Sequence, residues 1–217
     1  MSLTEPTDGA ARPAETGRDD GGKRREILEG ARRVFRAKGF DGASMGEIAR
    51  AAGVSKGTLY VYFDNKVALF EALVENDRNE TAERLYTLDE SDPDVRSVLY
   101  RLAISFQEMM TRPEHIAMVR MVIGAAEKFP TIGRRFFLSG PDHGTKRLAA
   151  YLATQVAAGR LVIDDVERAA GQFLNLAHGR SAKALLFAVD AEPSEAEMVA
   201  TAKAAVALFF AAYGPKV

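Results

Sequence analysis

The sequence predicts an all-α protein in which an N-terminal three-helix domain with a helix-turn-helix is joined to a larger helical domain, about nine helices in total. Three observations favour this fold class. Apolar residues recur at three- and four-residue spacing along most of the chain, which is the period of an amphipathic helix. Capping residues and prolines stand where these patterns begin, and glycines stand where several of them end. Two short patterns between residues 44 and 63 are joined by a tight glycine turn, as in a helix-turn-helix.

Composition limits the class of protein. The chain has 217 residues, of which 47% are hydrophobic, so it can bury a sizeable core. It has no cysteine, which excludes disulfides, thiolate metal sites and cysteine nucleophiles and fits a reducing cytoplasm. No apolar run approaches the roughly 20 residues of a membrane span, and the polar, acidic start of the chain does not resemble an export signal. We therefore expect a cytoplasmic protein without a membrane partner.

Positive charge is concentrated in one segment. The net charge is -1, yet residues 23–66 carry ten basic and five acidic side chains. Residues 1–22 and residues 67–217 each have an excess of three acidic groups. This asymmetry concentrates attraction for a polyanion near the amino terminus. The alternative is an ordinary charged helix face in contact with solvent.

The chain before residue 40 predicts a disordered tail followed by a helix. Residues 1–20 have few large apolar groups, so they cannot offset the entropy lost on ordering. Asp19 or Asp20 can cap the helix, and Gly39 can supply its left-handed end. The apolar stripe of this helix comprises Ile27, Leu28, Ala31, Val34 and Phe35.

Two short helices are expected next. Ser44 and Glu47 have the spacing of a capping box at the start of the first of them. Gly53 ends this helix, and Ser55 can cap the following one, which continues to Tyr62. The pair joined by a glycine turn is the helix-turn-helix.

The second helix of this pair has an inward and an outward side. Small side chains at Ala49 and Ala52 allow the two helices to approach closely, and Leu59 faces back into the core. The outward side carries groups that can reach phosphates and base edges in a DNA major groove. These residues are Lys56, Gly57, Thr58, Tyr60 and Tyr62. For the two tyrosines the alternative is packing against a neighbouring helix, and packing is the interpretation that we prefer for Phe63.

The stretch FRAKGFDGASMGEIARAAGVSKGTLYVYFDNKVALFEALV, residues 35–74, resembles the DNA-binding domain of the tetracycline-repressor (TetR) family. The F-x-x-x-G-F ending of the first helix, the A-x-x-A-G-V-S-x-G-T-L-Y-x-Y-F core and the lysine that opens the fourth helix occur together at the family's spacing. The resemblance implies a DNA-binding domain over residues 21–66 and a helical effector-binding and dimerisation domain over residues 67–217. It also implies repression at a palindromic operator, which a small hydrophobic effector relieves.

Position by position, the resemblance implies phosphate contacts from Ser44, where the family more often has threonine, and from Tyr62 and Lys66. Positive charge near the amino terminus of a helix, as at Lys66, adds attraction where a phosphate would lie. The positions of the recognition helix hold Lys56, Gly57, Thr58 and Tyr60. Arg24 and Arg25, ahead of the first helix, are further candidates for backbone or minor-groove contacts.

The rest of the chain predicts helices throughout. Asp64 or Asn65 can cap a long fourth helix over about residues 66–88, which would link the DNA-binding domain to the remainder. Residues 92–93, an Asp-Pro pair, supply the N-cap and first residue of the next helix, and Pro113 begins another.

Residues 116–179 are similar to the carboxyl-terminal domain of the AcrR and AefR-like branch of the TetR family. The similarity includes the AAEKFP segment at residues 125–130, a later glycine-proline pair and the stretch AAGRLVIDDVERAAGQFLNL. The last two helices, at about residues 165–189 and 194–213, form a four-helix bundle with a symmetry mate in the family. The alternative is packing within one monomer. The candidate interface residues are Ala169, Leu176, Ala184, Val199, Ala202, Val206, Phe209 and Phe210.

An effector cavity is expected to be apolar with a few polar groups. The candidate walls are Phe106, Met109, Met110, Met118, Met121, Val122, Phe129 and Phe173, and the candidate polar groups are Gln172, Asn175 and His178. The alternatives are that the methionines and aromatic residues are plain core and that His178 lies in a dimer interface.

An enzyme is the chief alternative from another class of protein. The three histidines, His115, His143 and His178, are not at HExxH spacing, and none stands beside a serine nucleophile motif. Asp164 and Asp165 suit a helix cap better than a catalytic acid and base. We therefore expect no catalysis, no metal and no cofactor. An activator or a ligand-independent DNA-binding protein remains a second alternative.

Overall fold

The computed structural model describes residues 20–85, 88, 92–189 and 192–215. Its described residues form helices and no strand, as the all-α prediction required. In chain order the elements are α1 (Asp20–Gly42), α2 (Met45–Ala51), α3 (Lys56–Tyr62), α4 (Lys66–Leu85), α5 (Val95–Thr111), α6 (Pro113–Ala126), α7 (Pro130–Phe137), the π-helix η1 (Leu138–Asp142), α8 (His143–Ala157), α9 (Val166–His178), α10 (Ser181–Leu186) and α11 (Glu195–Tyr213). The expected tail at residues 1–20, apart from the backbone of Asp20, and the cap expected from Asp19 or Asp20 lie outside the described residues.

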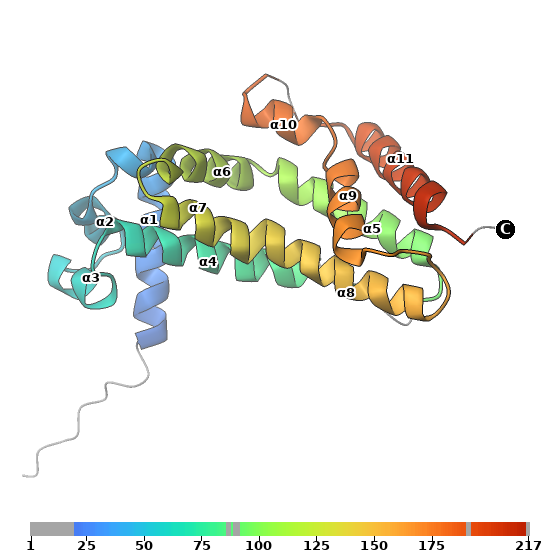
Figure 1. The fold of residues 1–217 in the computed structure, drawn as a ribbon. Helices are drawn as coiled ribbons and strands as arrows, with labels where there is room; N and C mark the ends of the chain where they lie inside the picture. The colour runs from blue at the N-terminus through green and yellow to red at the C-terminus, as the bar shows by residue number, and fades with distance from the viewer. Residues whose placement is uncertain (1–19, 86–87, 89–91, 190–191, 216–217) are drawn as a thin grey trace, which may run out of the picture.

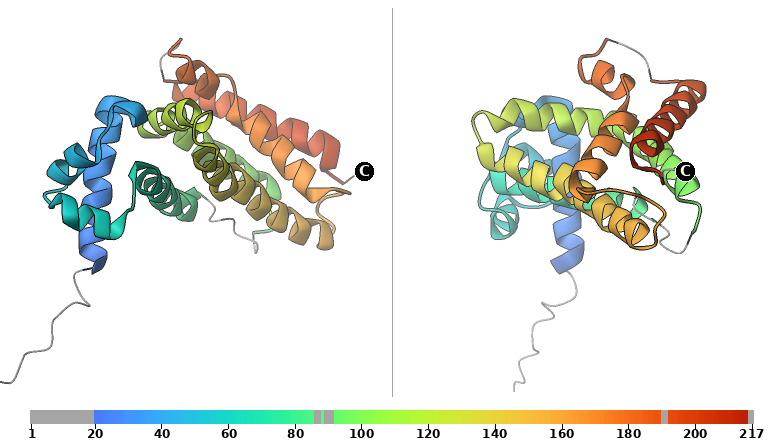
Figure 2. Two further views of the ribbon diagram at one scale, coloured as in Figure 1. Left: turned by 60° about the vertical axis from the view of Figure 1, so that its left-hand side comes forward. Right: turned by 45° about the vertical axis from the view of Figure 1, so that its right-hand side comes forward.

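The molecule is elongated, with α1, α2 and α3 at one end (Figure 1). Helices α5, α9, α10 and α11 lie toward the opposite end, and α4, α6 and α7 run between the two parts. The two further views in Figure 2 keep the same arrangement. We call α1, α2, α3 and the start of α4 the amino-terminal module.

Local capping signals position the helices of the amino-terminal module. Helical geometry in α1 is interrupted at Gly39, where φ is 70° and ψ is 178°, at the predicted end of the helix. Ser44 and Ser55 are the N-caps of α2 and α3, and each hydroxyl accepts the backbone N–H three residues on, at 3.3 and 3.0 Å. Gly53, with φ of 68°, forms the turn between them. The helix-turn-helix therefore has the predicted boundaries.

Ala52 packs against α1, whereas we expected it to bring α2 close to α3. A Cβ placed on Gly30 of α1 would lie 2.6 Å from the Cβ and from the backbone nitrogen of Ala52. The two helices can approach this closely only because Gly30 has no side chain. No sequence signal marks this glycine, because it lies inside a helix and at no turn.

Two hydrophobic clusters form the interior. The carboxyl-terminal cluster contains buried residues of α5, α8, α9 and α11. The amino-terminal cluster contains buried residues of α1, α2, α3 and α4. It also includes Met118, Val122 and Ala125 of α6 and Ile132 of α7. The core of the amino-terminal module is therefore shared with the following helices and extends past the boundary expected at residue 66.

Two helices differ from the sequence prediction. Asp94, rather than Asp92, is the N-cap of α5, and its carboxylate accepts the backbone N–H of Ser97 at 3.1 Å. The helix expected over residues 165–189 is divided into α9 and α10 at Gly179, where φ is 64°. The other predicted starts are confirmed at Asn65, Pro113, Asp165 and Ser194.

Helix α11 is more apolar than the sequence analysis expected. By length and composition alone it could cross a membrane, with a mean hydropathy of 1.4, although core helices of soluble proteins pass the same test. One side of α11 packs into the carboxyl-terminal cluster through Ala202, Ala205, Val206 and Phe209. The opposite side is exposed and carries Ala200, Ala204, Ala207, Leu208 and Ala211, which we call the α11 ridge.

The close contact between α1 and α2 gives a stability prediction. Gly30→Ala should lower the free energy of unfolding by about 1–3 kcal/mol or more, because the added methyl group collides with the backbone of Ala52. Gly124→Ala in α6 is the matched control, since a Cβ there meets no atom within 4 Å and alanine favours a helix. Urea unfolding of both variants measures the difference. Equal stability of the two variants would contradict the packing described here.

Candidate nucleic-acid interface

Helix α3 is held by one side and exposes the other. Leu59 is fully buried, and Phe63, just after the helix, is only 6% exposed, as the packing interpretation of Phe63 predicted. Tyr60 is 49% exposed, and Lys56 and Gly57 are exposed as well. Tyr62 is half-buried against the amino-terminal cluster. The exposed side of α3 thus presents an ammonium group and a phenol, while Leu59 and Phe63 hold the helix on the core.

The side chain of Lys56 crosses from α3 to α2. A Cβ placed on Gly46 would lie 2.8 Å from Cε and 3.3 Å from Nζ of Lys56. The ammonium group therefore lies over the first turn of α2, near the cap at Ser44. Gly46, which the sequence analysis did not single out, leaves room for this path.

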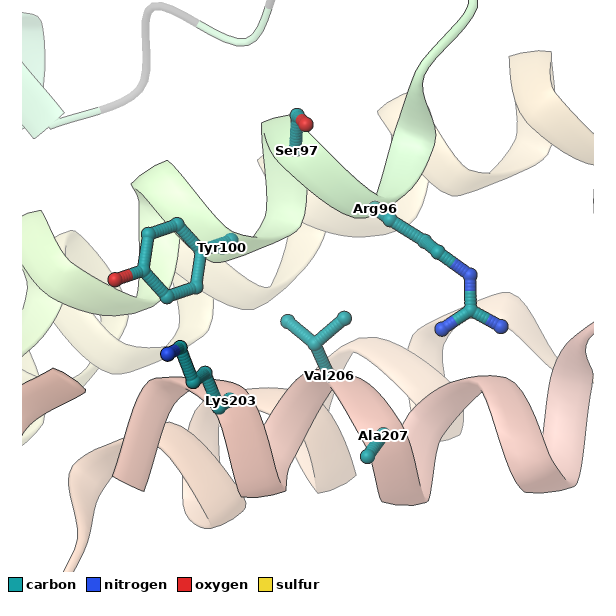
Figure 3. Close-up of a pocket in the computed structure, with 6 residues that line it drawn as sticks. All are labelled: Arg96, Ser97, Tyr100, Lys203, Val206 and Ala207. Atoms are coloured by element: carbon teal, nitrogen blue, oxygen red, sulfur yellow. The ribbon is translucent and has the colours of Figure 1, made fainter. Parts of the chain in front are cut away.

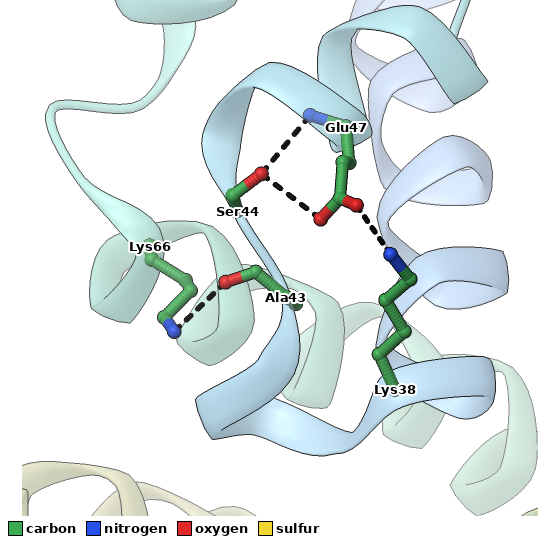
Figure 4. A network of polar contacts seen from close by, with 5 residues as sticks. All are labelled: Lys38, Ala43, Ser44, Glu47 and Lys66. Atoms are coloured by element: carbon green, nitrogen blue, oxygen red, sulfur yellow. Dashed lines mark hydrogen bonds and ion pairs between the residues drawn. The ribbon is translucent and has the colours of Figure 1, made fainter.

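Ser44 is engaged in a polar network (Figure 4). Its hydroxyl donates to Oε2 of Glu47 at 2.9 Å while accepting the Glu47 backbone N–H. The Glu47 carboxylate also accepts a hydrogen bond from Nζ of Lys38. The hydrogen bond from Lys38, together with that from Ser44, lowers the pKa of Glu47 below its ordinary value. The Ser44 hydroxyl can donate a hydrogen bond to a phosphate only if it gives up the hydrogen bond that it donates to Glu47.

Lys66 points into the protein. Its Nζ donates to the backbone carbonyls of Phe40 at 2.7 Å, Ala43 at 2.9 Å and Asp41 at 3.3 Å. The same nitrogen lies 4.6 Å from the centroid of the Phe40 ring. All three N–H donors of Lys66 are therefore directed to residues 40–43, the turn that follows the kink of α1 at Gly39 and leads into α2. The phosphate contact implied by the family resemblance stays a prediction, and in the structure Lys66 clamps this turn.

Two arginines of α1 contact the other helices of the module. The guanidinium group of Arg24 lies 5.5 Å from the centroid of the Phe63 ring. Arg33 donates a hydrogen bond to the backbone carbonyl of Ala51, at the end of α2. Arg25 is exposed. Sequence spacing gave no signal for the contact of Arg33, because its partner lies on another helix.

The interface is joined to the carboxyl-terminal part by ion pairs and one aromatic contact. The rings of Phe40 and Phe129 have centroids 5.4 Å apart. Ion pairs join Arg36 to Glu114 at 3.1 Å, Lys128 to Asp41 at 3.1 Å, and Arg135 to Glu71 at 3.1 Å and to Glu75 at 2.6 Å. The AAEKFP segment therefore docks on the turn that Lys66 clamps.

The structure separates the proposed walls of the effector cavity into two groups. Met118, Met121, Val122 and Phe129 belong to the amino-terminal cluster or pack against it. Phe106 and Phe173 belong to or pack against the carboxyl-terminal cluster. Met109 and Met110 are half-buried near the end of α5. Helical spacing shows that a side is buried but not which helix covers it, so the sequence did not indicate this division. That these residues line one effector cavity stays a prediction.

Most of the proposed polar contacts already have partners within the chain. Gln172 accepts a hydrogen bond from the hydroxyl of Tyr213, and Asn175 donates to the backbone carbonyl of Gly171 at 2.9 Å. The ring of His178 lies 6.3 Å from that of Phe106. Burial, with a smaller contribution from Lys183, lowers the pKa of His178 and favours the neutral ring. Of the candidate effector contacts, the apolar Phe106 and the polar His178 therefore lie next to each other.

Most of the proposed dimer residues are buried within one chain. This group comprises Ala169, Ala184, Ala202, Val206 and Phe209. These side chains pack inside the single chain and leave little surface for a partner. The part that these two helices play in a dimer stays a prediction. Leu176 is exposed, and Val199 and Phe210 are half-buried.

An all-α chain that presents a helix-turn-helix with an exposed cationic face has the architecture of a helix-turn-helix regulator. Residues 27–73 match the model of the family "Bacterial regulatory proteins, tetR family". Residues 97–215 match that of the "AefR-like transcriptional repressor, C-terminal domain". The chain belongs to the TetR family, as the sequence resemblance predicted.

Similar proteins of known structure cover nearly the whole chain. The Flavonoid-responsive Regulator FrrA is 31% identical with a TM-score of 0.81, and the similarity covers 91% of this chain and 100% of FrrA. A TetR-family transcriptional regulator from Mesorhizobium loti is 28% identical with a TM-score of 0.84, and the similarity covers 90% of this chain and 98% of that one.

The similarity to two curated relatives covers only part of each chain. The transcriptional repressor AcnR of Corynebacterium efficiens is 43% identical over 60 residues, which are 28% of this chain and 32% of AcnR. The regulator YvdT of Bacillus subtilis is 38% identical over 78 residues, which are 36% of this chain and 40% of YvdT. The chain thus spans well under half the length of these curated relatives.

The inward position of Lys66 gives a prediction that separates it from Lys56. Lys66→Met should lower the free energy of unfolding by about 1–3 kcal/mol, because the carbonyls of the turn lose their donor while the apolar stem is kept. Lys56→Met, on the exposed side of α3, should change stability by less than about 0.5 kcal/mol. Chemical denaturation followed by circular dichroism measures both. A Lys66 variant as stable as the wild type would show that the clamp is unimportant.

Proposed function

We propose that this protein is a transcriptional repressor that binds a pseudo-palindromic operator as a homodimer and is released by a small hydrophobic effector. The observation that carries the proposal is the exposed face of α3, with Lys56 and Tyr60 exposed and Thr58 half-buried beside them, on a helix-turn-helix. Membership of the TetR family and the repressor names of its matches support it. We further propose that the protein acts in the cytoplasm and is not an enzyme.

The groups on α3 have different tasks in this proposal. Lys56 binds a phosphate through an ammonium group that lies between α2 and α3. Tyr60 reaches base edges with its exposed phenol. Thr58 is held in place, because its Oγ1 lies 2.9 Å from Oγ of Ser55 and shares a hydrogen bond with it. The glycine at position 57 leaves the backbone of α3 open to close approach.

A titration of operator DNA tests the DNA contact. Lys56→Ala should weaken binding to specific and scrambled duplexes alike and reduce the slope of log affinity against log salt by about 0.9, because one phosphate contact is lost. Lys183→Ala, which removes an exposed lysine of α10, is the matched control and should change neither. Fluorescence anisotropy against duplexes from the protein's own promoter region, at several salt concentrations, measures both quantities. An unchanged slope for Lys56→Ala would remove α3 from the interface.

The α11 ridge supports the homodimer. Its residues recur at three- and four-residue spacing, and all are exposed in the single chain. Small side chains allow two helices to pack closely, and a twofold dimer buries the same surface on both chains. Leu176 on α9 is exposed as well and adds apolar surface. The dimer we propose therefore uses the ridge rather than the residues expected from the sequence.

Charge introduced into the ridge should disrupt the dimer. Ala204→Glu places a carboxylate in the middle of the ridge, where burial against a second copy would leave it unpaired. We expect it to be monomeric at micromolar concentration in analytical ultracentrifugation and to bind the operator weakly, because each half-site is then bound separately. Ala153→Glu on the exposed side of α8 is the control and should remain dimeric. A dimeric Ala204→Glu protein would place the interface elsewhere.

The chemistry of the effector is the least defined part of the proposal. FrrA, which is similar over its whole length, is named as flavonoid-responsive. Flavonoids and other planar aromatic compounds are therefore the first compounds to add to the operator titration. The pair of Phe106 and His178 supplies an aromatic ring and a neutral imidazole that suit such a ligand.

A further inference from the structure

A groove between α5 and α11 carries positive charge that the proposed function does not use (Figure 3). Its volume is about 250 Å³. Its lining consists of Arg96, Ser97 and Tyr100 from α5 and Lys203, Val206 and Ala207 from α11. The groove adjoins the α11 ridge, with which it shares Ala207, and none of its lining residues lies in the amino-terminal module.

The two cations of the groove have no carboxylate partner among the described residues. The two acids that precede α5 have other partners: Asp92 pairs with Arg101 at 2.8 Å, and Asp94 accepts the hydroxyl of Ser97, at the edge of the groove, at 2.6 Å. The guanidinium group of Arg96 lies 4.0 Å from the centroid of the Phe210 ring, and this stacking restrains it. The groove therefore attracts an anion and offers a restrained guanidinium group to receive it.

The middle of the groove is apolar. Figure 3 shows Val206 between Arg96 at one end and Lys203, beside the ring of Tyr100, at the other. Arg96 and Tyr100 are four residues apart on α5, which corresponds to roughly 6 Å along the helix axis. A ligand that lies along the groove thus meets a guanidinium group, an apolar surface and then an ammonium group with a phenol.

We propose that this groove binds a small aromatic carboxylate with a second polar group at its far end, such as a hydroxybenzoate. The carboxylate pairs with the guanidinium group of Arg96, whose planar fork matches two oxygens. The aromatic ring lies on Val206, and the distal hydroxyl meets Lys203 and the phenol of Tyr100. The apolar middle of the groove favours such a ligand over an inorganic anion.

Calorimetric titration of the full-length protein with 4-hydroxybenzoate, without DNA, tests this proposal. We expect saturable binding with one site per chain. Arg96→Gln and Lys203→Gln should each weaken it at least fivefold, because each removes one charge. Lys183→Gln, outside the groove, should bind like the wild type. Lys203 is exposed, so its variant tests the site even if Arg96→Gln loses stability through the lost stacking on Phe210.

Two further ligands test the chemical class. Benzoate should bind more weakly than 4-hydroxybenzoate, and the neutral analogue 4-hydroxybenzyl alcohol should not bind. No saturable binding at millimolar 4-hydroxybenzoate would overturn the site, and so would binding by both groove variants that is as tight as that of the wild type. Equally strong binding of inorganic phosphate would overturn the aromatic specificity. Because no DNA is present, failure here leaves the proposed repressor function untouched, and failure of operator binding leaves this site untouched.

Discussion

The arrangement of the DNA-binding helices depends on one ammonium group. Carbonyls at the end of a helix lack partners within that helix, and Lys66 supplies donors to three carbonyls in the turn that follows Gly39. The turn leads directly into the cap of α2 at Ser44, and Lys66 is the first residue of α4. These hydrogen bonds of Lys66 therefore fix the start of α2 relative to the start of α4. Since α3 follows α2 after a tight turn, its exposed face is fixed as well.

The same turn receives the carboxyl-terminal part of the molecule. Phe129 packs on Phe40 from one side, and Phe35 and Phe70 pack on it from others, with ring centroids 5.2–5.9 Å from that of Phe40. Exposed ion pairs such as that of Lys128 with Asp41 contribute at most about 1 kcal/mol each, so the buried aromatic contact dominates. A ligand that moves the AAEKFP segment would strain the turn and displace α2. A coupling of about 1–3 kcal/mol changes affinity roughly 5- to 150-fold, which such a contact can supply.

Features set by neighbours in sequence could be predicted, and those set by distant partners could not. Caps at Ser44, Ser55 and Asn65 act within four residues, so the sequence predicts where those helices begin. The contact of Gly30 with Ala52 and the partners of Lys66 join residues about two dozen positions apart on different helices. The cluster that each candidate cavity wall joins could not be predicted for the same reason, because an apolar stripe on α6 is equally suited to either cluster. Helix α11 has alanines on both its buried side and its exposed side. The spacing of its alanines therefore could not distinguish the buried side from the ridge.

The polar network at Ser44 shows why charge, more than any single contact, governs the proposed interface. Glu47 places a carboxylate where a phosphate is expected to approach, and the hydrogen bonds from Lys38 and Ser44 lower its pKa further below neutral pH. Lys38 neutralises this carboxylate locally and leaves Lys56, over the first turn of α2, to act on the phosphate. Four basic side chains of the segment have partners within the chain: Lys38 pairs with Glu47, Lys66 bonds the turn, Arg24 lies over Phe63 and Arg33 bonds the carbonyl of Ala51. Net charge read from the sequence therefore overstates the number of cations available to DNA, and the groups that remain on the exposed face determine the affinity.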